Sequence, residues 1–310
     1  MAASREIPLP EVDARFDLER HQREVREQGL SIIEDALTIE QTERLSERLR
    51  LQVQGEQRRG ARGYAAIETA DDITQWVSML PNKGDCFADL LLNPPVYRLA
   101  RHFLGSECIV TDLSARVTRS GSPAMGLHTD QWWLPEARMP DQEPVRVADM
   151  TRAYEEPHPS SPAPASHPIN PMVVFTVIYV FDDITEEMGP TRFVPGSHLS
   201  GKQPDPDTKY EEIAPELSRG SAIVFDGRLW HGGSLNRSGR PRPAVLMGYT
   251  GPQFRPILNF PFGLRPEVVE KLPDDVRKVL GFRVWNGYGA TDDFSALFAT
   301  PGRENTGPLE

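Results

Sequence analysis

The chain has 310 residues, of which 38% are hydrophobic and 25% are charged, and its formal net charge is −11. This composition is typical of a globular protein, and no apolar run approaches the roughly 20 residues that a membrane-spanning helix needs, which argues against membrane insertion. The acidic balance argues against a general affinity for nucleic acid or anionic lipid.

The amino terminus and the cysteines predict a cytoplasmic protein. Residues 1–6 lack the apolar core of a signal peptide. The two cysteines, Cys86 and Cys108, are expected to be reduced and buried. The sequence leaves a monomer and a homodimer equally open.

The first hundred residues favour helices. Residues 12–28 predict a helix that Gly29 stops, and residues 30–33 predict a short strand. Thr38 lies three residues before Gln41, which is the spacing of a capping box and predicts the start of a second helix. The apolar side of that helix is expected to carry Leu45, Leu49 and Leu51.

A further helical region is predicted over residues 86–104, with a break at Asn93-Pro94-Pro95. After Gly105 the chain favours strands separated by Gly and Pro turns. These strands are expected over residues 108–110, 114–118, 172–181, 220–225 and 243–249, with a shorter one between turns in residues 189–198. The run 172–181 is apolar throughout, which indicates a strand covered on both faces.

Helices at the beginning and short strands afterwards predict a mainly β fold, a jelly roll with flanking helices. We expect one domain over residues 1–310, and divide it into a mainly helical wrap (1–105), a jelly-roll core (106–252) and a C-terminal closing segment (253–310) with a short helix at 266–280. Residues 134–171 are polar, rich in proline and too long for an ordinary connection. Such an insertion is either a lid or disordered, and we favour the lid because it leaves directly from the expected metal strand.

The candidate metal ligands begin with His128 and Asp130. Side chains two residues apart in a strand leave on the same face, so the imidazole and the carboxylate lie side by side. His231 offers a third ligand directly after the apolar run 222–225. Two histidines and one carboxylate on one face of an octahedron leave the other face open for a co-substrate and dioxygen, the arrangement of non-haem Fe(II) oxygenases.

Arg242 strengthens this interpretation, because a His-x-Asp triplet alone often arises by chance. Arg242 follows His231 on the next expected strand, where its planar guanidinium can hold a carboxylate by two charged hydrogen bonds. The ligand that this geometry invites is 2-oxoglutarate, with its keto acid end on the iron and its remote carboxylate on Arg242. Arg240 is the alternative. Trp132 and Trp133 are candidates for the substrate site, with ordinary packing as the competing interpretation.

The remaining histidines are expected to have structural roles. His198, in a Pro-Gly-Ser-His turn, is interpreted as a turn residue or a support for the ligands, because His231 has the better strand context. The others are expected at the surface or in packing: His21, His102, His158 and His167.

Three segments carry a resemblance to a known family: 128–131, 188–198, and 230–242 with its Trp230-His231 and Asn236-Arg237-Ser238 motifs. In these the chain resembles the phytanoyl-CoA dioxygenase (PhyH)-like branch of the Fe(II)/2-oxoglutarate oxygenases. The resemblance runs from Gly29 through the strand that ends at Tyr249. It implies a double-stranded β-helix (jelly roll, cupin-like), with iron on His128, Asp130 and His231. It also implies 2-oxoglutarate on Arg242, with help from Thr191.

The chain also departs from the family pattern. Family members often have a glutamine where this chain has Met125, and some have a hydroxyl where it has Gly233. Related halogenases replace the carboxylate ligand with a small residue, so Asp130 disfavours halogenation.

The reaction that the resemblance implies begins with oxidative decarboxylation of 2-oxoglutarate to succinate and carbon dioxide. Removal of hydrogen from a substrate C–H bond follows, and hydroxylation is the default outcome. Desaturation, ring closure and endoperoxide formation stay open. Ascorbate is the expected activator in vitro.

The expected substrate is a small, largely apolar molecule, such as a specialised metabolite. An acyl thioester of coenzyme A is the alternative, although no strong basic cluster marks a site for its phosphates. Two non-oxidative alternatives also stay open: a cupin-like protein that binds a metal or ligand, and an isomerase that uses the same histidines without dioxygen.

Overall fold

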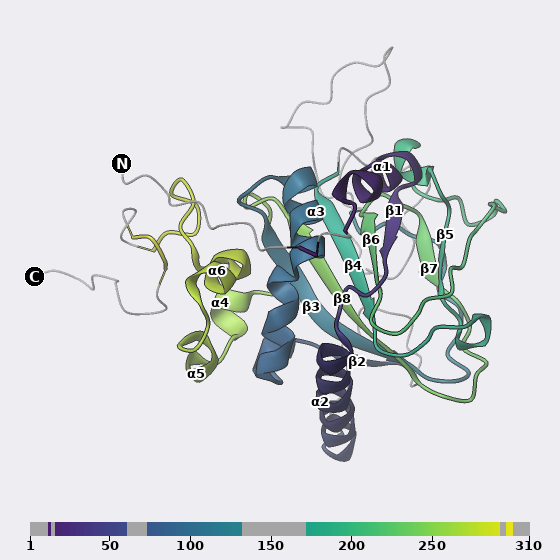
Figure 1. Ribbon diagram of the computed structural model, residues 1–310, viewed down its shortest axis with the longest axis horizontal. Coiled ribbons are helices and arrows are strands. Elements are labelled where there is room, and N and C mark those ends of the chain that lie inside the picture. Colours follow the sequence, from purple (N-terminus) through teal and green to yellow (C-terminus); the bar gives the residue numbers. More distant parts are fainter. Residues whose placement is uncertain (1–11, 14–15, 61–72, 132–171, 292–295, 300–310) are drawn as a thin grey trace, which may run out of the picture.

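The protein is built around a large antiparallel sheet. The computed structural model describes residues 12–13, 16–60, 73–131, 172–291 and 296–299 (Figure 1). The large sheet has the strand order β1-β6-β4-β8-β3-β2. Its strands are β1 (Leu30–Ile33), β6 (Ala222–Asp226), β4 (Val174–Val180), β8 (Arg242–Thr250), β3 (Ile109–Thr118) and β2 (Gln75–Val77). A smaller sheet pairs β5 (Thr191–Phe193) with β7 (His231–Gly233).

Both faces of the large sheet are covered. On β4, Phe175, Val177 and Tyr179 belong to the hydrophobic core on the side of the helices. Ile178 and Val180 belong to a second core, which Phe193 of the smaller sheet also enters. Every residue of β4 is buried, which confirms the prediction of a strand covered on both faces.

The predicted N-terminal helices are present. Helix α1 (Leu18–Gln28) ends at Gly29, whose φ of 91° is a left-handed conformation that glycine adopts without strain. Helix α2 (Ile39–Arg58) begins with the predicted capping box of Thr38 and Gln41. The predicted helical region before residue 105 is divided into a 3-10 helix, η2 (Asp85–Leu92), and α3 (Pro94–Leu104), for which Asn93 is the N-cap.

Leu51 was wrongly placed on the buried side of α2. Leu45 and Leu49 are buried, whereas Leu51 is 43% exposed. Residues along an α-helix are about 100° apart, so Leu51 points about 200° away from Leu49. The elements before residue 105 also do more than wrap the core, because β1 and β2 form the two edges of the large sheet.

The predicted strands at 108–110 and 114–118 form one continuous strand, β3. The register between β3 and β8 shifts between Val110 and Asp112, which marks a β-bulge. Residues 111–113, between the two predicted strands, are therefore part of β3 and do not separate two strands.

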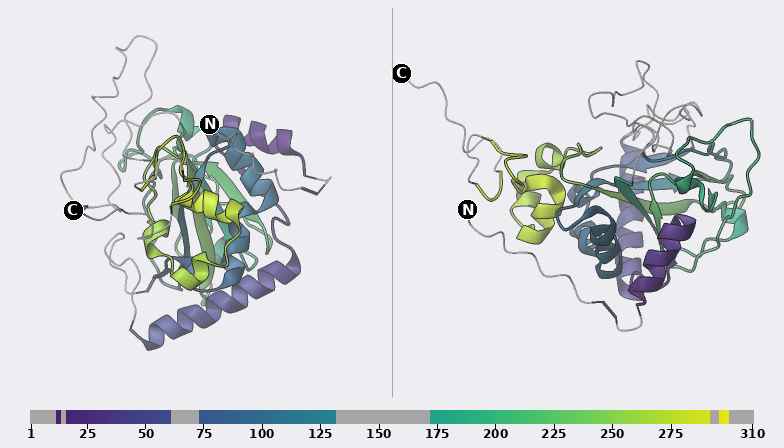
Figure 2. Two further views of the ribbon diagram at one scale, coloured as in Figure 1. Left: turned by 90° about the vertical axis from the view of Figure 1, so that its left-hand side faces the viewer. Right: turned by 90° about the horizontal axis from the view of Figure 1, so that it is seen from above.

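The single helix expected at 266–280 is wrong. The segment contains α5 (Pro266–Val269), α6 (Asp274–Arg277) and a π-helical turn, η6 (Lys278–Phe282). Pro273 lies between α5 and α6, and a proline disfavours helical backbone at the residue before it. Together with α4 (Phe260–Gly263), these helices gather at one end of the molecule (Figures 1 and 2).

Three short 3-10 helices complete the described structure: η1 (Leu80–Asn82), η4 (Glu186–Met188) and η5 (Ser197–Leu199). Among the described residues, no helix is long and apolar enough to cross a membrane. The segment 134–171, which we interpreted as a lid, lies outside the described residues.

Candidate metal and co-substrate site

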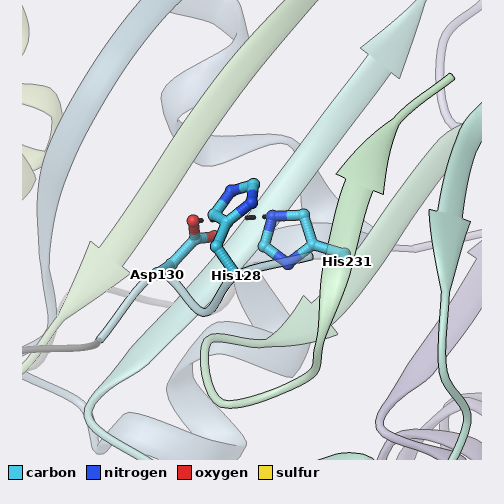
Figure 3. Close-up of side chains that lie close together, drawn as sticks. All are labelled: His128, Asp130 and His231. Carbon is cyan, nitrogen blue, oxygen red and sulfur yellow. Dashed lines mark ion pairs between the residues drawn. The ribbon is translucent and has the colours of Figure 1, made fainter. Parts of the chain in front are cut away.

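The structure brings His128, Asp130 and His231 together. Their candidate ligand atoms all lie within 4.8 Å of one another. Nε2 of His231 is 3.6 Å from Oδ1 of Asp130, and the centres of the two imidazole rings are 4.3 Å apart. Figure 3 shows the three side chains pointing toward a common centre. Two residues from one loop and one from a distant strand therefore form a group that can hold one metal ion.

The backbone fixes this convergence. His128 and His231 exchange two backbone hydrogen bonds, of 2.9 and 3.0 Å, and the amide of Asp130 donates to the carbonyl of Gly227 at 2.8 Å. The predicted metal strand is wrong in detail, because His128 makes an isolated bridge and Asp130 lies in a turn. The preceding residues include Pro123, which lacks an amide proton and cannot donate in a regular ladder.

Both imidazoles are oriented by backbone carbonyls. Nδ1 of His128 lies 3.1 Å from the carbonyl oxygen of Gly126, and Nδ1 of His231 lies 2.9 Å from that of Leu229. Because a carbonyl can only accept, each Nδ1 carries the proton and each Nε2 keeps a lone pair for a metal.

Burial and aromatic packing also favour a metal-binding form. Burial lowers the pKa of His128 to about 4, and the neighbouring His231 adds to the shift. His128 is therefore neutral at physiological pH, as a ligand must be. Phe225 meets the ring of His231 edge to face at 4.7 Å, and Phe193 stacks on it at 6.0 Å.

A threonine holds the carboxylate of the candidate ligand Asp130. Thr176 of β4 donates a 2.5 Å hydrogen bond to Oδ2 of Asp130. Thr176 was not predicted as a functional residue, although a hydroxyl inside the apolar run 172–181 is an available signal. A buried polar side chain in a core strand needs a partner.

Asp112 was also missed. It lies on β3 opposite Gly248, which is in turn opposite Thr176, so the three residues cross the sheet in a row. Burial and, to a smaller extent, the charge of Asp130 raise the pKa of Asp112 to about 6, whereas the 2.7 Å hydrogen bond from Ser114 opposes the shift. An acidic residue between two predicted strands is the sequence feature that could have drawn attention to Asp112.

Arg242 is the first residue of β8 and is buried. Its guanidinium donates to the carbonyl of Gly189 and to the hydroxyl of Thr118. Both partners are neutral, and within the described ranges no carboxylate pairs with it. Burial, together with the charge of Arg116, lowers the pKa of Arg242 to about 10. A buried cation is costly unless it is paired, so this site fits an anionic ligand.

Arg240, the alternative arginine, lies outside the candidate site. Arg240 is exposed, and its guanidinium lies 4.0 Å from the sulfur of Met188, so Arg242 is the better candidate. Thr191 is half-buried and pairs with Gly233, two residues from His231. Trp132 and Trp133 lie outside the described residues.

The remaining histidines fit structural roles. His198 is buried, and its Nε2 lies 3.0 Å from the carbonyl oxygen of Arg26. His21 is buried and bonds the hydroxyl of Ser31 at 2.7 Å. His102 contacts the guanidinium of Arg26. His158 and His167 are not among the described residues.

Curated relatives and solved structures resemble the chain over most of its length. Dioxygenase af480 of Aspergillus fumigatus is 27% identical over 271 residues, which cover 86% of this chain and 78% of the relative. A crystal structure of the epimerase SnoN in complex with Fe3+, alpha ketoglutarate and nogalamycin RO has a TM-score of 0.55 at 20% identity and covers 83% of this chain and 90% of that one. HygX from Streptomyces hygroscopicus, with nickel, 2-oxoglutarate and hygromycin B bound, has a TM-score of 0.52 at 15% identity and covers 76% and 88%.

The solved structures confirm the predicted fold, a double-stranded β-helix with flanking helices, and they contain the predicted co-substrate. The family model described as phytanoyl-CoA dioxygenase (PhyH) matches residues 25–244. This range is more than half of the chain and includes the three candidate ligands and Arg242. The predicted class of enzyme, a dioxygenase, is confirmed, and the chain belongs to the phytanoyl-CoA dioxygenase family.

Proposed function

We propose that the protein hydroxylates a C–H bond of a small, largely apolar molecule, with iron held by His128, Asp130 and His231. The observation that carries the proposal is the convergence of these side chains, with each imidazole Nε2 left available by a backbone carbonyl. The balanced reaction converts substrate, 2-oxoglutarate and dioxygen into hydroxylated substrate, succinate and carbon dioxide.

When bound, iron and 2-oxoglutarate would supply the oxidising power for removal of hydrogen from the substrate. The protein supplies position and charge. In our proposal, Arg242 binds the remote carboxylate of 2-oxoglutarate and thereby orients its keto acid end toward the three ligands. Thr191 lies at the adjacent position on β5 and is proposed as a second contact for the co-substrate.

Two further features support the proposed ligand set. The hydrogen bond from Thr176 restricts rotation of the Asp130 carboxylate, so that Oδ1 faces His231. The rings of Phe193 and Phe225 limit access of water to the inner side of His231. Side chains that are already fixed bind a metal ion more tightly, because little side-chain freedom is lost on binding.

The proposed substrate is a specialised metabolite rather than an acyl thioester. The compared structures contain the small molecules nogalamycin RO and hygromycin B. The net charge of −11 is unfavourable for binding the phosphates of coenzyme A. Trp132 and Trp133 follow the ligand segment directly and stay candidates for contacts with this substrate.

The test is release of succinate by the purified protein with Fe(II), ascorbate and 2-oxoglutarate. We expect slow release without substrate and faster release with the correct one, and no release by the Asp130→Ala variant. The mass of the product then distinguishes hydroxylation, which adds one oxygen atom, from desaturation or ring closure, which removes two hydrogen atoms. If iron binds and no candidate substrate ever gives succinate, a non-oxidative function replaces this proposal.

A further inference from the structure

A second arginine lies beside Arg242. Arg116 is on β3, and its cross-strand partner is Ala244, while Arg242 pairs with Thr118. Arg116 and Arg242 are therefore diagonal neighbours on the same face of the sheet, a relationship that places Cα atoms roughly 7–8 Å apart. Both long side chains can thus reach one common point.

That point lies against Gly233 of β7. A β-carbon added to Gly233 would lie 3.6 Å from Nη1 of Arg116, 3.9 Å from Nη2 of Arg242 and 4.0 Å from the β-carbon of Met125. Gly233 is two residues from His231 on the same strand. Two guanidinium groups from different strands therefore face the same position next to the proposed iron ligands.

The structure holds Arg116 in this place. Its guanidinium lies over the ring of Trp76, 5.7 Å from the centroid, and Trp76 is its cross-strand partner on β2. A cation stacked on a tryptophan face is attracted by the ring and loses side-chain freedom. The position of Arg116 is therefore set before any ligand binds.

The two guanidinium groups carry like charges and repel each other. Burial lowers the pKa of Arg242, and the repulsion from the charge of Arg116 lowers it as well. A carboxylate that reaches both guanidinium groups is attracted by each of them, since a charge-assisted hydrogen bond contributes roughly 1.5–3 kcal/mol. The pair of arginines is thus suited to an anion.

The two residues at which this chain departs from the family pattern, Met125 and Gly233, lie at the point that Arg116 and Arg242 face. The family resemblance led us to expect an amide donor where Met125 stands, and in some members a hydroxyl where Gly233 stands. Met125 has no donor in its side chain, and Gly233 has no side chain at all. The guanidinium of Arg116 fills the space in front of Gly233, and a guanidinium offers five N–H donors.

We propose that Arg116 is a second arginine of the co-substrate site, which binds the remote carboxylate of 2-oxoglutarate together with Arg242. It replaces the donors that residues 125 and 233 lack. This inference rests on the proposed function, because it requires 2-oxoglutarate to bind beside the three ligands.

The test measures binding of two keto acids to the Ni(II)-loaded protein by calorimetry. 2-Oxoglutarate has the remote carboxylate, and 2-oxobutyrate has the same keto acid end without it. The variants are Arg116→Met and Arg116→Lys. The matched control is Arg240→Met, which removes the same charge from an exposed side chain outside the site.

We expect Arg116→Met to weaken binding of 2-oxoglutarate about 10- to 100-fold and to leave 2-oxobutyrate unchanged. Arg116→Lys keeps the charge but loses the planar fork, so we expect a loss of several-fold. Adding Gly233→Ser to Arg116→Met restores a hydroxyl donor, and we expect part of the affinity to return. The Arg240→Met control should bind both keto acids as the unaltered protein does.

Equal binding of 2-oxoglutarate by Arg116→Met and Arg240→Met overturns the inference, and so does an equal loss for both keto acids. If Arg116→Met does not fold, Arg116→Lys decides: unchanged affinity for 2-oxoglutarate contradicts the role. Failure of the proposed function has a different result, because the unaltered Ni(II)-loaded protein would then bind neither keto acid.

Discussion

The hydroxyl of Thr176 donates a 2.5 Å hydrogen bond to Oδ2 of Asp130, while the other oxygen of that carboxylate, Oδ1, lies 3.6 Å from Nε2 of His231. The threonine comes from β4 in the middle of the large sheet, and the aspartate comes from a turn. The sheet therefore orients a candidate metal ligand that is not itself part of a strand.

Replacing Thr176 by valine keeps the shape of the side chain and removes this hydrogen bond. We expect metal affinity to fall about 10- to 100-fold, as for other supporting contacts of metal ligands. Calorimetric titration with Ni(II) measures the effect. Thr250→Val is the matched control, because its hydroxyl donates to the carbonyl of Val173 instead of a candidate ligand. Equal affinities for the two variants would show that the bond does not support the metal site.

Gly232 of β7 lies against the backbone of the residues that precede His128. A β-carbon at Gly232 would lie 2.7 Å from the carbonyl oxygen of Met125 and 2.9 Å from that of Gly126. Gly232→Ala must push this backbone away, so we expect a loss of about 1–3 kcal/mol of stability and weaker metal binding. At Gly233 the nearest atom is 3.6 Å away, so Gly233→Ala should leave both unchanged. Denaturant unfolding and metal titration check the pair, and a tolerated Gly232→Ala contradicts the close approach.

Asp112 makes stability depend on pH. Burial raises its pKa to about 6 in the folded protein, above the roughly 3.9 of an unfolded chain, so unfolding releases a proton between these values. Stability is therefore lost as pH rises through this window. In metal-free protein, we expect Asp112→Asn to be more stable by about 2 kcal/mol at pH above 7, with the difference shrinking toward pH 4.

Urea unfolding at several pH values with a chelator present measures this difference. The control is Asp207→Asn, which replaces an exposed aspartate. A stability gain for Asp112→Asn that is independent of pH, or that grows as pH falls, contradicts a buried carboxyl with a raised pKa.

The sequence predicted the residues that act through local spacing. His128 and Asp130 are two residues apart, and Arg242 follows His231 after a short connection, so their proximity depends on a few residues of chain. The fold class followed from strand formers between Gly and Pro turns. Even so, His128 and Asp130 do not lie in a regular strand: His128 makes an isolated bridge and Asp130 lies in a turn. The two side chains can point the same way without a complete ladder of strand hydrogen bonds.

The supporting residues could not be predicted from spacing. Thr176 lies beside Asp130, and Arg116 beside Arg242, because distant segments of the chain pack together, and this packing is not written in the local sequence. The predicted helix at 266–280 is wrong for a local reason, since Pro273 interrupts it and begins a new helix.

The most direct test of the central claim is a crystal structure of the protein with Mn(II) and 2-oxoglutarate under anaerobic conditions, with the metal located by anomalous scattering. We expect one metal ion bonded to Nε2 of His128, Nε2 of His231 and the Asp130 carboxylate, with the co-substrate completing its open side and reaching Arg242. A metal peak away from these three side chains, or bonded to only one of the histidines, would contradict the proposed site.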